Sequence, residues 1–589
     1  MSFLRKFFNF VDLTRKVILN LFFILALLFI AITFLVSDVK EDLSAVITFA
    51  PKKINETTNS NLSFFERETY ELNLFEIISA IETAGTEEEV KILFMDLTYL
   101  DISFTGILEI GKAIESFKSQ GKKVIAYSDF YDKKNYLLAS YADSILLNQN
   151  GLVLLDGFSS QKPFIKQLLE KLNIGVSTFV SGKYKSALDT FTRDNLSEED
   201  RLQTSSYLSE VWDSWKEIIT KNRSKISDLK IDNYINNLGK LTEKFDGDTA
   251  KLAKSEGLID TLIVRTNLND YLSSLVEEKI ISFKDNLALL NNENSSDNKF
   301  AVLVASGEII DGEYAEGAIS SENFSKTLNK IDKDKSIKGL FLRVNSPGGS
   351  GFASEIIRQR LELLNKKIPI VISMGDIAAS GGYWISMNQN TIIANPFTLT
   401  GSIGVWAALP NFKDSFENVG ILFDKVSTNE LNFSLLEPPN DNLSSFMQSY
   451  VDGSYNKFIK LVSKNRQLTI DNTEKIAQGR IWSGKSALQN NLVDSLGVFQ
   501  DGIKILEEKS GISDFKIKYI STSPGIIDDL FASFNSFLNS TYSLFGFIES
   551  IDIQRLVSKK KIETNLICLV CPELRSVSYT HLTLPTTKN

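Results

Sequence analysis

Residues 338–349, Lys-Gly-Leu-Phe-Leu-Arg-Val-Asn-Ser-Pro-Gly-Gly, join a short apolar segment to a glycine-rich turn. Residues 91–97, Lys-Ile-Leu-Phe-Met-Asp-Leu, repeat the apolar segment 247 positions earlier, but Thr98–Ile102 after it contains no glycine. The two segments share their length, their leading lysine and their central Leu-Phe pair. This match indicates that the chain contains two copies of one unit, and that the copies differ at the turn.

The same offset of 247 residues continues along both copies. Val124–Tyr127 matches Val371–Met374, and Ser144–Asn148 matches Thr391–Asn395. Chance similarity rarely keeps one register over so long a stretch. The large central part of the chain is therefore an internal repeat.

Helical patterns alternate with the apolar segments in each copy, and the predicted helices span residues 108–118 and 353–364. Strands that alternate with helices pair in parallel, because each helix crosses over the sheet. The sequence therefore predicts an α/β fold made of two tandem repeats.

The repeat divides the chain into predicted segments, with an Asn-, Ser- and Asp-rich linker between the copies. These segments are a cytoplasmic N-terminus (1–16), a transmembrane signal-anchor (17–36), a first repeat (55–284), the linker (285–298), a second repeat (299–515), a helical extension (516–576) and a tail (577–589). The tail resembles a translated sequencing-library adaptor, so we expect it to be disordered and without function. In the extension, residues 526–547 have the spacing of an amphipathic helix with an aromatic face.

Residues 17–36, VILNLFFILALLFIAITFLV, are about as long as a helix needs to be to cross a hydrocarbon core. Four basic residues and one acid precede them, whereas three acids follow closely. This asymmetry predicts a cytoplasmic N-terminus and places the bulk of the chain across the membrane. A cleaved signal peptide is the alternative, but Leu35–Asp38 offers no small-residue cleavage site.

The composition excludes several classes of protein. The chain has 64 basic and 73 acidic residues and a net charge of −9, which argues against a nucleic-acid partner. Neither a phosphate-binding G-x-x-x-x-G-K-[ST] loop nor a strand-linked G-x-G-x-x-G is present. The two cysteines, Cys568 and Cys571, are too few for a zinc site and are incidental thiols or one local disulfide. We therefore expect no metal and no cofactor.

Ser380 lies before a glycine pair in the second copy, where the first copy has Lys133–Asn135. The glycine-rich turn at residues 345–349 is likewise missing from the first copy. Glycines let backbone N–H groups approach a ligand closely, so two such loops beside one serine suggest an oxyanion hole. Each loop alone is also an ordinary turn signal. A purely structural turn should have served both copies, and this favours the functional interpretation.

The only histidine, His581, lies in the predicted non-native tail, so a Ser-His-Asp triad is excluded. A nucleophilic Ser380 would need a lysine, a carboxylate or an amine terminus as its base. The first copy contains Gly182-Lys-Tyr-Lys-Ser-Ala187 after a strand-like segment, and the second copy has no lysine at the matching position near Leu431. The serine loop and a lysine loop therefore each occur once, in opposite copies.

Four strings closely resemble the long, duplicated form of the signal peptide peptidase A (protease IV) family of bacterial inner membranes. They are Gly182–Ala187, Asn345–Gly349, Ala378–Trp384 and Leu399–Gly404, and the resemblance covers most of residues 60–515 plus the anchor. It implies a fold related to Clp protease and the crotonases, with β-β-α units assembled into a dome-like tetramer.

The resemblance also assigns roles to residues. It implies Ser380 as nucleophile, Lys185 as general base, Ser402 as a support for the lysine, and Gly348, Gly349 and Gly381 as the oxyanion site. A free lysine amine is protonated at neutral pH, so Lys185 must be buried and must not pair with the nearby Asp189 or Asp194.

The expected function is that of a membrane-anchored endopeptidase that degrades cleaved signal peptides and other short apolar peptides. It would work as a homo-oligomer at the outer face of the bacterial inner membrane. The alternatives are a crotonase-like acyl-CoA enzyme and a catalytically inactive membrane scaffold. The sequence leaves open the side-chain preference and whether the two dyad residues meet within one chain. We also expect Asp376 to be a helix N-cap.

Overall fold

The computed structural model describes residues 45–57, 73–276, 280–282 and 296–522, without 314, 316, 389, 430 and 432, and a few isolated residues between 15 and 27. Most of the predicted membrane span at 17–36 lies outside these residues, as do the linker up to residue 295, most of the helical extension and the tail. Within the described ranges, no helix is both long enough and apolar enough to cross a lipid bilayer.

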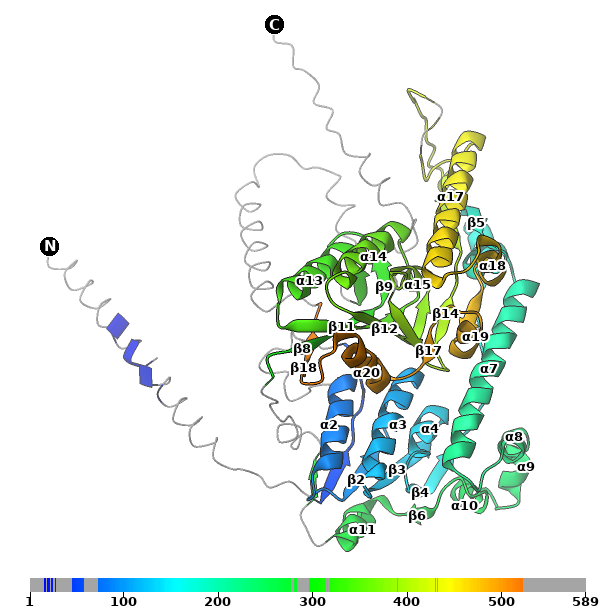
Figure 1. The fold of residues 1–589 in the computed structure, drawn as a ribbon. Helices are drawn as coiled ribbons and strands as arrows, with labels where there is room; N and C mark the ends of the chain where they lie inside the picture. The colour runs from blue at the N-terminus through cyan, green and yellow to red at the C-terminus, as the bar shows by residue number, and fades with distance from the viewer. Residues whose placement is uncertain are drawn as a thin grey trace, which may run out of the picture.

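Two sheets form the body of the protein, and each repeat supplies one (Figure 1). The strand order is β6-β4-β3-β2-β1-β7 in the first repeat and β17-β13-β12-β11-β8-β18 along the matching path of the second. All neighbours along both paths are parallel, as predicted. The strands of the first sheet are β1 (Val46–Phe49), β2 (Ile92–Asp96), β3 (Lys123–Tyr131), β4 (Ser144–Val153), β6 (Thr261–Ile263) and β7 (Ile280–Ser282). Those of the second along the matching path are β8 (Lys299–Ser306), β11 (Ile337–Ser346), β12 (Ile370–Ala379), β13 (Thr391–Ala394), β17 (Ser495–Leu496) and β18 (Lys516–Ile520).

Two predicted boundaries of the repeats need correction. Strand β1 lies before the predicted start at residue 55, yet it pairs with β2 in the centre of the first sheet. Strand β18 lies in the predicted helical extension, but it pairs with β8 and places Tyr519 opposite Val302. Both strands complete a sheet, so each repeat is longer than the register of 247 residues indicates.

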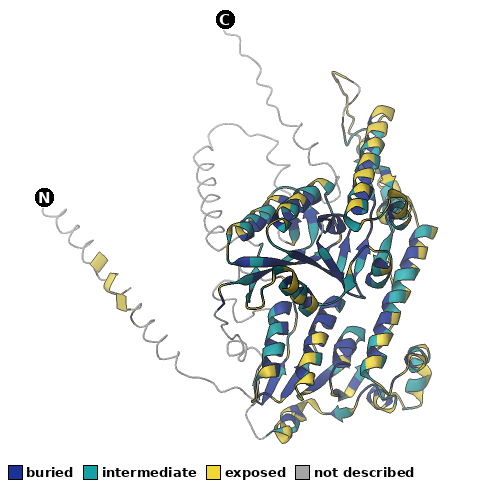
Figure 2. Ribbon diagram, viewed as in Figure 1, coloured by how far each residue is buried: buried dark blue, intermediate teal, exposed yellow. Residues whose placement is uncertain are grey.

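The helices pack in layers around the two sheets (Figure 1). Helices α2 (Leu74–Thr86), α3 (Phe104–Ser119) and α20 (Phe499–Ser510) lie between the sheets, and share one hydrophobic core with residues of both. Helices α13 (Ser321–Lys333) and α14 (Gly351–Asn365) cover the outer face of the second sheet. Figure 2 shows the most buried residues concentrated in the sheets and in the helices between them.

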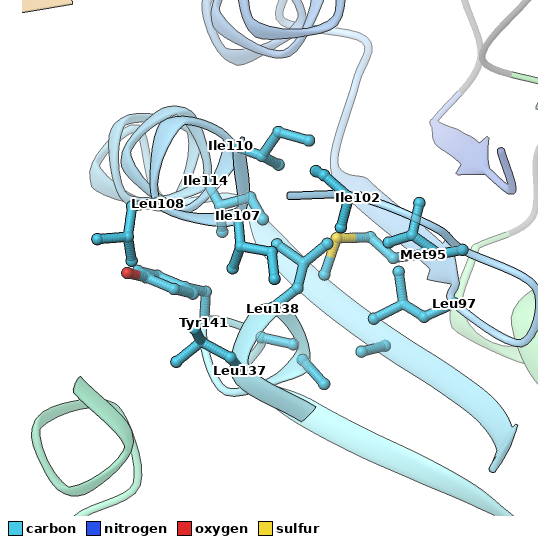
Figure 3. Packing of buried hydrophobic residues seen from close by; sticks show 14 of the residues in the cluster. Met95, Leu97, Ile102, Ile107, Leu108, Ile110, Ile114, Leu137, Leu138 and Tyr141 are labelled. Atoms are coloured by element: carbon cyan, nitrogen blue, oxygen red, sulfur yellow. The ribbon is translucent and has the colours of Figure 1, made fainter. Parts of the chain in front are cut away.

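Helix α3 shows how sequence spacing builds this core. The Ser103 side chain caps it by accepting a hydrogen bond from the Gly106 N–H, so the helix begins four residues earlier than predicted. Ile107, Ile110 and Ile114 follow the helical period and form one buried stripe in the shared core (Figure 3). Helix α14 likewise confirms and slightly extends the prediction for residues 353–364.

A buried ionic network holds the two repeats together. Arg343 on β11 is 1% exposed, and its guanidinium lies 3.0 Å from Glu109 of α3 and 2.7 Å from Glu56. Glu56 also accepts a hydrogen bond of 3.2 Å from Asn345, the residue before the Ser-Pro-Gly-Gly turn. A buried charge is tolerated only when it is paired. Removal of Arg343 would therefore leave two carboxylates at the repeat interface without a cation.

The prediction that Asp376 caps a following helix is wrong, because this residue lies inside β12. Its carboxylate accepts hydrogen bonds from the backbone N–H of Thr105 at 2.9 Å and from the Thr105 hydroxyl at 2.7 Å. Thr105 is in the first turn of α3, where backbone N–H groups have no partner within the helix. Asp376 thus does bind a helix N-terminus, but one that belongs to the other repeat.

A second link between the repeats lies outside the sheets. Strand β5 (Gly175–Ser181) of the first repeat pairs in antiparallel fashion with β15 (Val405–Asn411) of the second, with Ser181 opposite Val405. Helix α17 (Asp441–Arg466) packs on this pair around Phe179 and Met447. The pairing brings the chain after β5 beside the chain before β15.

Replacing Arg343 with alanine should lower the free energy of unfolding by about 3–5 kcal/mol, because Glu109 and Glu56 would remain buried without a cation. Urea unfolding followed by circular dichroism measures this loss. The control is Lys221→Ala, which removes an exposed ion pair with Glu115 and should change stability by less than about 1 kcal/mol. Equal effects of the two substitutions would contradict a structural role for the network.

Candidate active site

Ser380 lies at a strained turn between β12 and the short helix α15 (Gly381–Ile385). Its backbone has φ 53° and ψ −115°, a conformation that residues with side chains rarely adopt. The turn is held because the Ser380 N–H donates to Gly401 O at 2.9 Å and the Trp384 N–H donates to Ser380 O at 2.8 Å. Strain of this kind persists only where surrounding contacts enforce it, and it is frequent at functional sites.

The two glycine loops meet backbone to backbone beside Ser380. A Cβ added to Gly348, which has φ 107°, would lie 2.7 Å from Gly381 N and 2.8 Å from Ser380 Cβ. A Cβ added to Gly381 would lie 2.6 Å from Ser354 Oγ. Both glycines are therefore required by this close approach, and Gly348 is required also by its positive φ.

The backbone N–H groups of these loops are not equivalent. The Gly348 N–H donates to Ser346 Oγ at 3.2 Å. The N–H groups of Gly349 and Gly381 have no hydrogen-bond acceptor among the residues that the structure describes. Two amides beside Ser380 are thus available to a bound oxygen atom.

Lys185 reaches the same point from the first repeat, four residues after the end of β5. Its Nζ lies 3.1 Å from Ser380 Oγ, 2.9 Å from Ser402 Oγ and 3.0 Å from Ser402 O. The side chain is 9% exposed. The question that the sequence left open has a geometric answer, because these residues meet within one chain.

Burial lowers the pKa of the Lys185 amine from 10.5 to about 7, since water no longer stabilises the ammonium ion. Neither acid near it in sequence is its partner, as predicted: Asp189 accepts a hydrogen bond from Ser197, and Asp194 lies 4.0 Å from Lys166. An amine with a pKa of about 7 is half unprotonated at neutral pH. It can therefore accept a proton from a neighbouring hydroxyl.

Ser402 follows the short strand β14 (Leu399–Gly401) and also has a positive φ, of 50°. Its N–H donates to Arg480 O at 2.8 Å, and its hydroxyl and carbonyl oxygens both face the lysine amine. All six residues that the sequence singled out therefore gather at one place, where they line a common cavity.

The cavity has a volume of about 750 Å³. Besides the residues already named, its wall includes the large aromatic side chains Phe352, Trp384, Trp406, Tyr450 and Phe458. This combination gives an apolar surface beside a small polar centre, which is the usual character of a binding site for small or extended ligands. Among the described residues, no group of three His, Cys, Asp or Glu side chains could hold a metal ion.

Sequence reasoning missed residues that support this centre. Gln203 on helix α7 (Glu198–Asn222) donates to Tyr184 O at 3.1 Å, and Gln478 and Gly479 lie against the lysine loop. The glycine after Gln478 is a turn signal that could have drawn attention to residues 478–479. Gln203 gives no such signal, because it sits inside an ordinary helical pattern.

An unprotonated amine beside a serine hydroxyl, with two free amide donors nearby, fits acyl transfer. The amine can remove the hydroxyl proton, and the amides can stabilise the tetrahedral oxyanion that forms when the oxygen attacks a carbonyl.

Comparisons with the sequences of known proteins agree with this chemistry. The model of Peptidase family S49 matches residues 116–278 and 362–513. Protease 4 of Haemophilus influenzae is 36% identical over 468 residues, which cover 76% of each chain. Protease 4 of Salmonella typhi is 33% identical over 551 residues, covering 88% of this chain and 87% of its own. Among solved structures, ClpP1 from Listeria monocytogenes matches with a TM-score of 0.23 and 14% identity, over 34% of this chain and 94% of its own.

Replacing Ser402 with aspartate should raise the pKa of Lys185 from about 7 to near or above its ordinary 10.5, because a carboxylate would face the amine. The matched control is Ser402→Asn, which has the same shape without the charge, and both residues tolerate a positive φ. Acetylation of Lys185 by acetic anhydride, quantified by mass spectrometry over a pH series, reports the midpoint. Identical midpoints in the two variants would contradict the contact between the Lys185 amine and residue 402.

Proposed function

Because the chain belongs to peptidase family S49 and is a serine protease, we propose that it is a membrane-anchored endopeptidase with a Ser380–Lys185 dyad. The observation that carries this proposal is the distance of 3.1 Å between Lys185 Nζ and Ser380 Oγ in a buried setting without carboxylate partners. No histidine is available for the usual triad outside the predicted tail.

In the proposed reaction, Lys185 takes the proton of Ser380 Oγ as this oxygen attacks the peptide carbonyl. The carbonyl oxygen becomes an anion, which the N–H groups of Gly349 and Gly381 stabilise by hydrogen bonds. The lysine then returns the proton to the leaving amine. In the second half of the reaction, Lys185 takes a proton from water, and the hydroxide formed attacks the acyl carbonyl. Lys185 then gives this proton to Ser380 Oγ as the acyl group leaves as a free acid.

Two further residues serve this chemistry by holding others in place. Ser402 accepts hydrogen bonds from the Lys185 amine through its hydroxyl and carbonyl oxygens. With both N–H groups of the neutral amine used in this way, its lone pair is left to face Ser380. Gly348 takes part through its lack of a side chain, because its own N–H already binds Ser346. The family resemblance implies that Gly348 helps to bind the oxyanion, and the role proposed here is narrower.

The proposed substrates are cleaved signal peptides and other short apolar peptides. The aromatic wall of the cavity supports this, since it offers apolar contact area beside the dyad. The acyl-CoA alternative gives no role to Lys185, so the placement of the lysine argues against it. The alternative of an inactive scaffold is tested by the dyad variants below.

We further propose that residues 17–36 anchor the enzyme in the bacterial inner membrane, with the bulk of the chain in the periplasm. We also propose that the enzyme forms a homotetramer. Apolar side chains exposed in the segment after β15 support self-association, among them Leu422 at 79% and Val426 at 100% exposure.

The full chain should sediment with inner membranes and, in mild detergent, have the mass of a tetramer of 66.0 kDa subunits in analytical ultracentrifugation. Removal of residues 1–36 should release it from membranes, because the apolar span is lost. Leu422→Asp should lower the mass, because a charge would enter the apolar contact. A full chain that stays in the supernatant when membranes are sedimented would contradict the proposed anchor. A monomeric mass in detergent would contradict the proposed tetramer.

Ser380→Ala and Lys185→Ala should each lower kcat/KM for a fluorogenic signal peptide by about a thousandfold or more, because each removes one half of the dyad. The matched control is Lys183→Ala, which removes a neighbouring, exposed lysine paired with Glu199 and should leave the rate near that of the parent. Unchanged cleavage by either dyad variant would refute the mechanism. An inactive parent would favour the scaffold alternative.

A further inference from the structure

A short loop of the second repeat contacts both segments that meet at the dyad. It comprises residues 477–480, between helix α18 (Ile470–Ile476) and strand β16 (Ile481–Ser483), and is called the clamp loop below. The loop has backbone strain of its own at Gln478, which has φ 56°, whereas Gly479, with φ 77°, has a conformation that glycine adopts freely. A strained loop that touches a reactive lysine is a candidate for a mechanical role.

On one side the clamp loop binds the lysine segment. The Tyr184 N–H donates to Gln478 O at 2.7 Å, and the Lys183 N–H donates to the Gln478 side-chain oxygen at 3.0 Å. These are the two residues before Lys185, so their position determines where the lysine side chain begins.

On its other side the clamp loop binds the Ser402 segment. The Gly479 N–H donates to Ile403 O at 2.7 Å, and the Ser402 N–H donates to Arg480 O at 2.8 Å. The loop therefore cross-links, through adjacent residues, the two chain segments whose contact forms the Lys185–Ser402 hydrogen bonds.

The fit is so close that only glycine is accommodated at Gly479. A Cβ added there would lie 2.7 Å from both Cβ and N of Lys185. Gly182 and Gly404 meet the loop in the same way, since added Cβ atoms would lie 2.8 Å from Gln478 C and from Gly479 Cα respectively. Backbone packed against backbone leaves no room for water between the loop and Cβ of Lys185.

The clamp loop is itself fixed to the second repeat. The Gln478 N–H donates to the Tyr455 hydroxyl at 3.3 Å, and its side-chain amide donates to Glu474, which also accepts from Tyr455 at 2.9 Å. The Arg480 guanidinium stacks on Trp482, 4.1 Å from the ring centre. These contacts give the loop a rigid base from which it can hold the lysine.

Gln203 adds a tie from the first repeat. Besides the bond to Tyr184 O, its side-chain oxygen accepts from the Ile481 N–H at 3.1 Å, directly after the clamp loop. The side chain is 1% exposed. One buried amide thus joins the lysine segment to the strand that continues the loop.

We propose that the clamp loop, with Gly479 as its central residue, positions Lys185 and limits the access of water to its amine beside Ser380. Gln203 supports the loop in this role through its hydrogen bonds. The proposal rests on the proposed function, because it assigns positioning residues to the same dyad. If the loop is displaced, the amine separates from Ser402 and gains water, and water favours the protonated form. The lysine then becomes a poorer base at neutral pH while the substrate cavity is retained.

The test is the Gly479→Ala variant of the full chain, assayed with a fluorogenic signal peptide from about pH 6 to pH 10. We expect kcat to fall about tenfold or more at neutral pH with little change in KM, because each unit of increase in the pKa of the amine lowers its neutral fraction about tenfold. The loss should shrink as the pH rises, since the activity profile moves to higher pH.

The matched control is Gly121→Ala. Gly121 has φ 79°, almost the value of Gly479, but a Cβ added there would meet nothing within 4 Å. This control therefore carries the backbone strain without the contact to Lys185, and it should keep the parent pH profile. If Gly479→Ala folds and also keeps the parent profile and kcat, the proposal is overturned.

If Gly479→Ala does not fold, Gln203→Met decides. Methionine keeps the volume of glutamine but removes the hydrogen bonds to Tyr184 and Ile481, together with a third to Asp200, so we expect a smaller shift of the profile in the same direction. Its control is Gln500→Met, in helix α20 away from the dyad, which should have no effect on the profile. An unshifted profile in Gln203→Met would overturn the proposal. A parent that cleaves at no pH would instead refute the proposed function, so the two failures are distinguishable.

Discussion

The antiparallel pairing of β5 with β15 is the constraint on which the candidate site depends. Lys185 and Ser380 are 195 positions apart and belong to different repeats, each with its own sheet. Seven residue pairs connect the two strands and fix their register, and the last pair, Ser181 with Val405, leaves the lysine segment beside the Ser402 segment. A slip of one residue would turn every side chain of the strand to the opposite face and move the lysine away from the serine. The buried network around Arg343 supports the same arrangement, because it joins α3 to the strands that end at the two glycine loops.

The two copies of the repeat have diverged where the site is built. Lys133 occupies in the first copy the position of Ser380, at the start of helix α4 (Lys133–Ala139). Its amine binds Asp156 at 2.8 Å and Gly157 O at 3.0 Å, while its carbonyl accepts from the Trp215 indole. These contacts indicate that Lys133 has a structural role. The first copy instead contributes β5 and the lysine segment, so one composite centre replaces the two identical ones that a symmetric duplication would give.

Much of this arrangement could be predicted from the sequence, because the central strands and helices of both copies keep one offset and the site residues lie in short strings of glycine, serine and lysine. The positions of the outer strands could not be predicted in this way. Strands β1 and β8 match in position within their sheets but not at that offset, and β7 and β18 differ again, since loops of unequal length intervene. Asp376 shows a second kind of limit: its preference for a helix N-terminus was correct chemistry, but its partner is Thr105, 271 residues away. Gln203 and the clamp loop act through backbone atoms of distant segments, and such contacts leave no periodic pattern in the sequence.

The energetics explain why so many contacts converge on one lysine. A decrease in the pKa of its amine from 10.5 to about 7 corresponds to about 5 kcal/mol of disfavoured protonation. The unfolded chain keeps the proton up to pH 10.5 and the folded chain only up to about 7, so this cost is full below pH 7 and disappears above pH 10.5. Three of the seven non-glycine residues with positive φ among the described residues, Ser380, Ser402 and Gln478, add strain of about 1–3 kcal/mol each at the same place. A segment free to move would relieve both penalties by exposing the amine to water. The site can keep a neutral lysine only because the β5–β15 pair, the clamp loop and the buried inter-repeat network leave the lysine segment no alternative position.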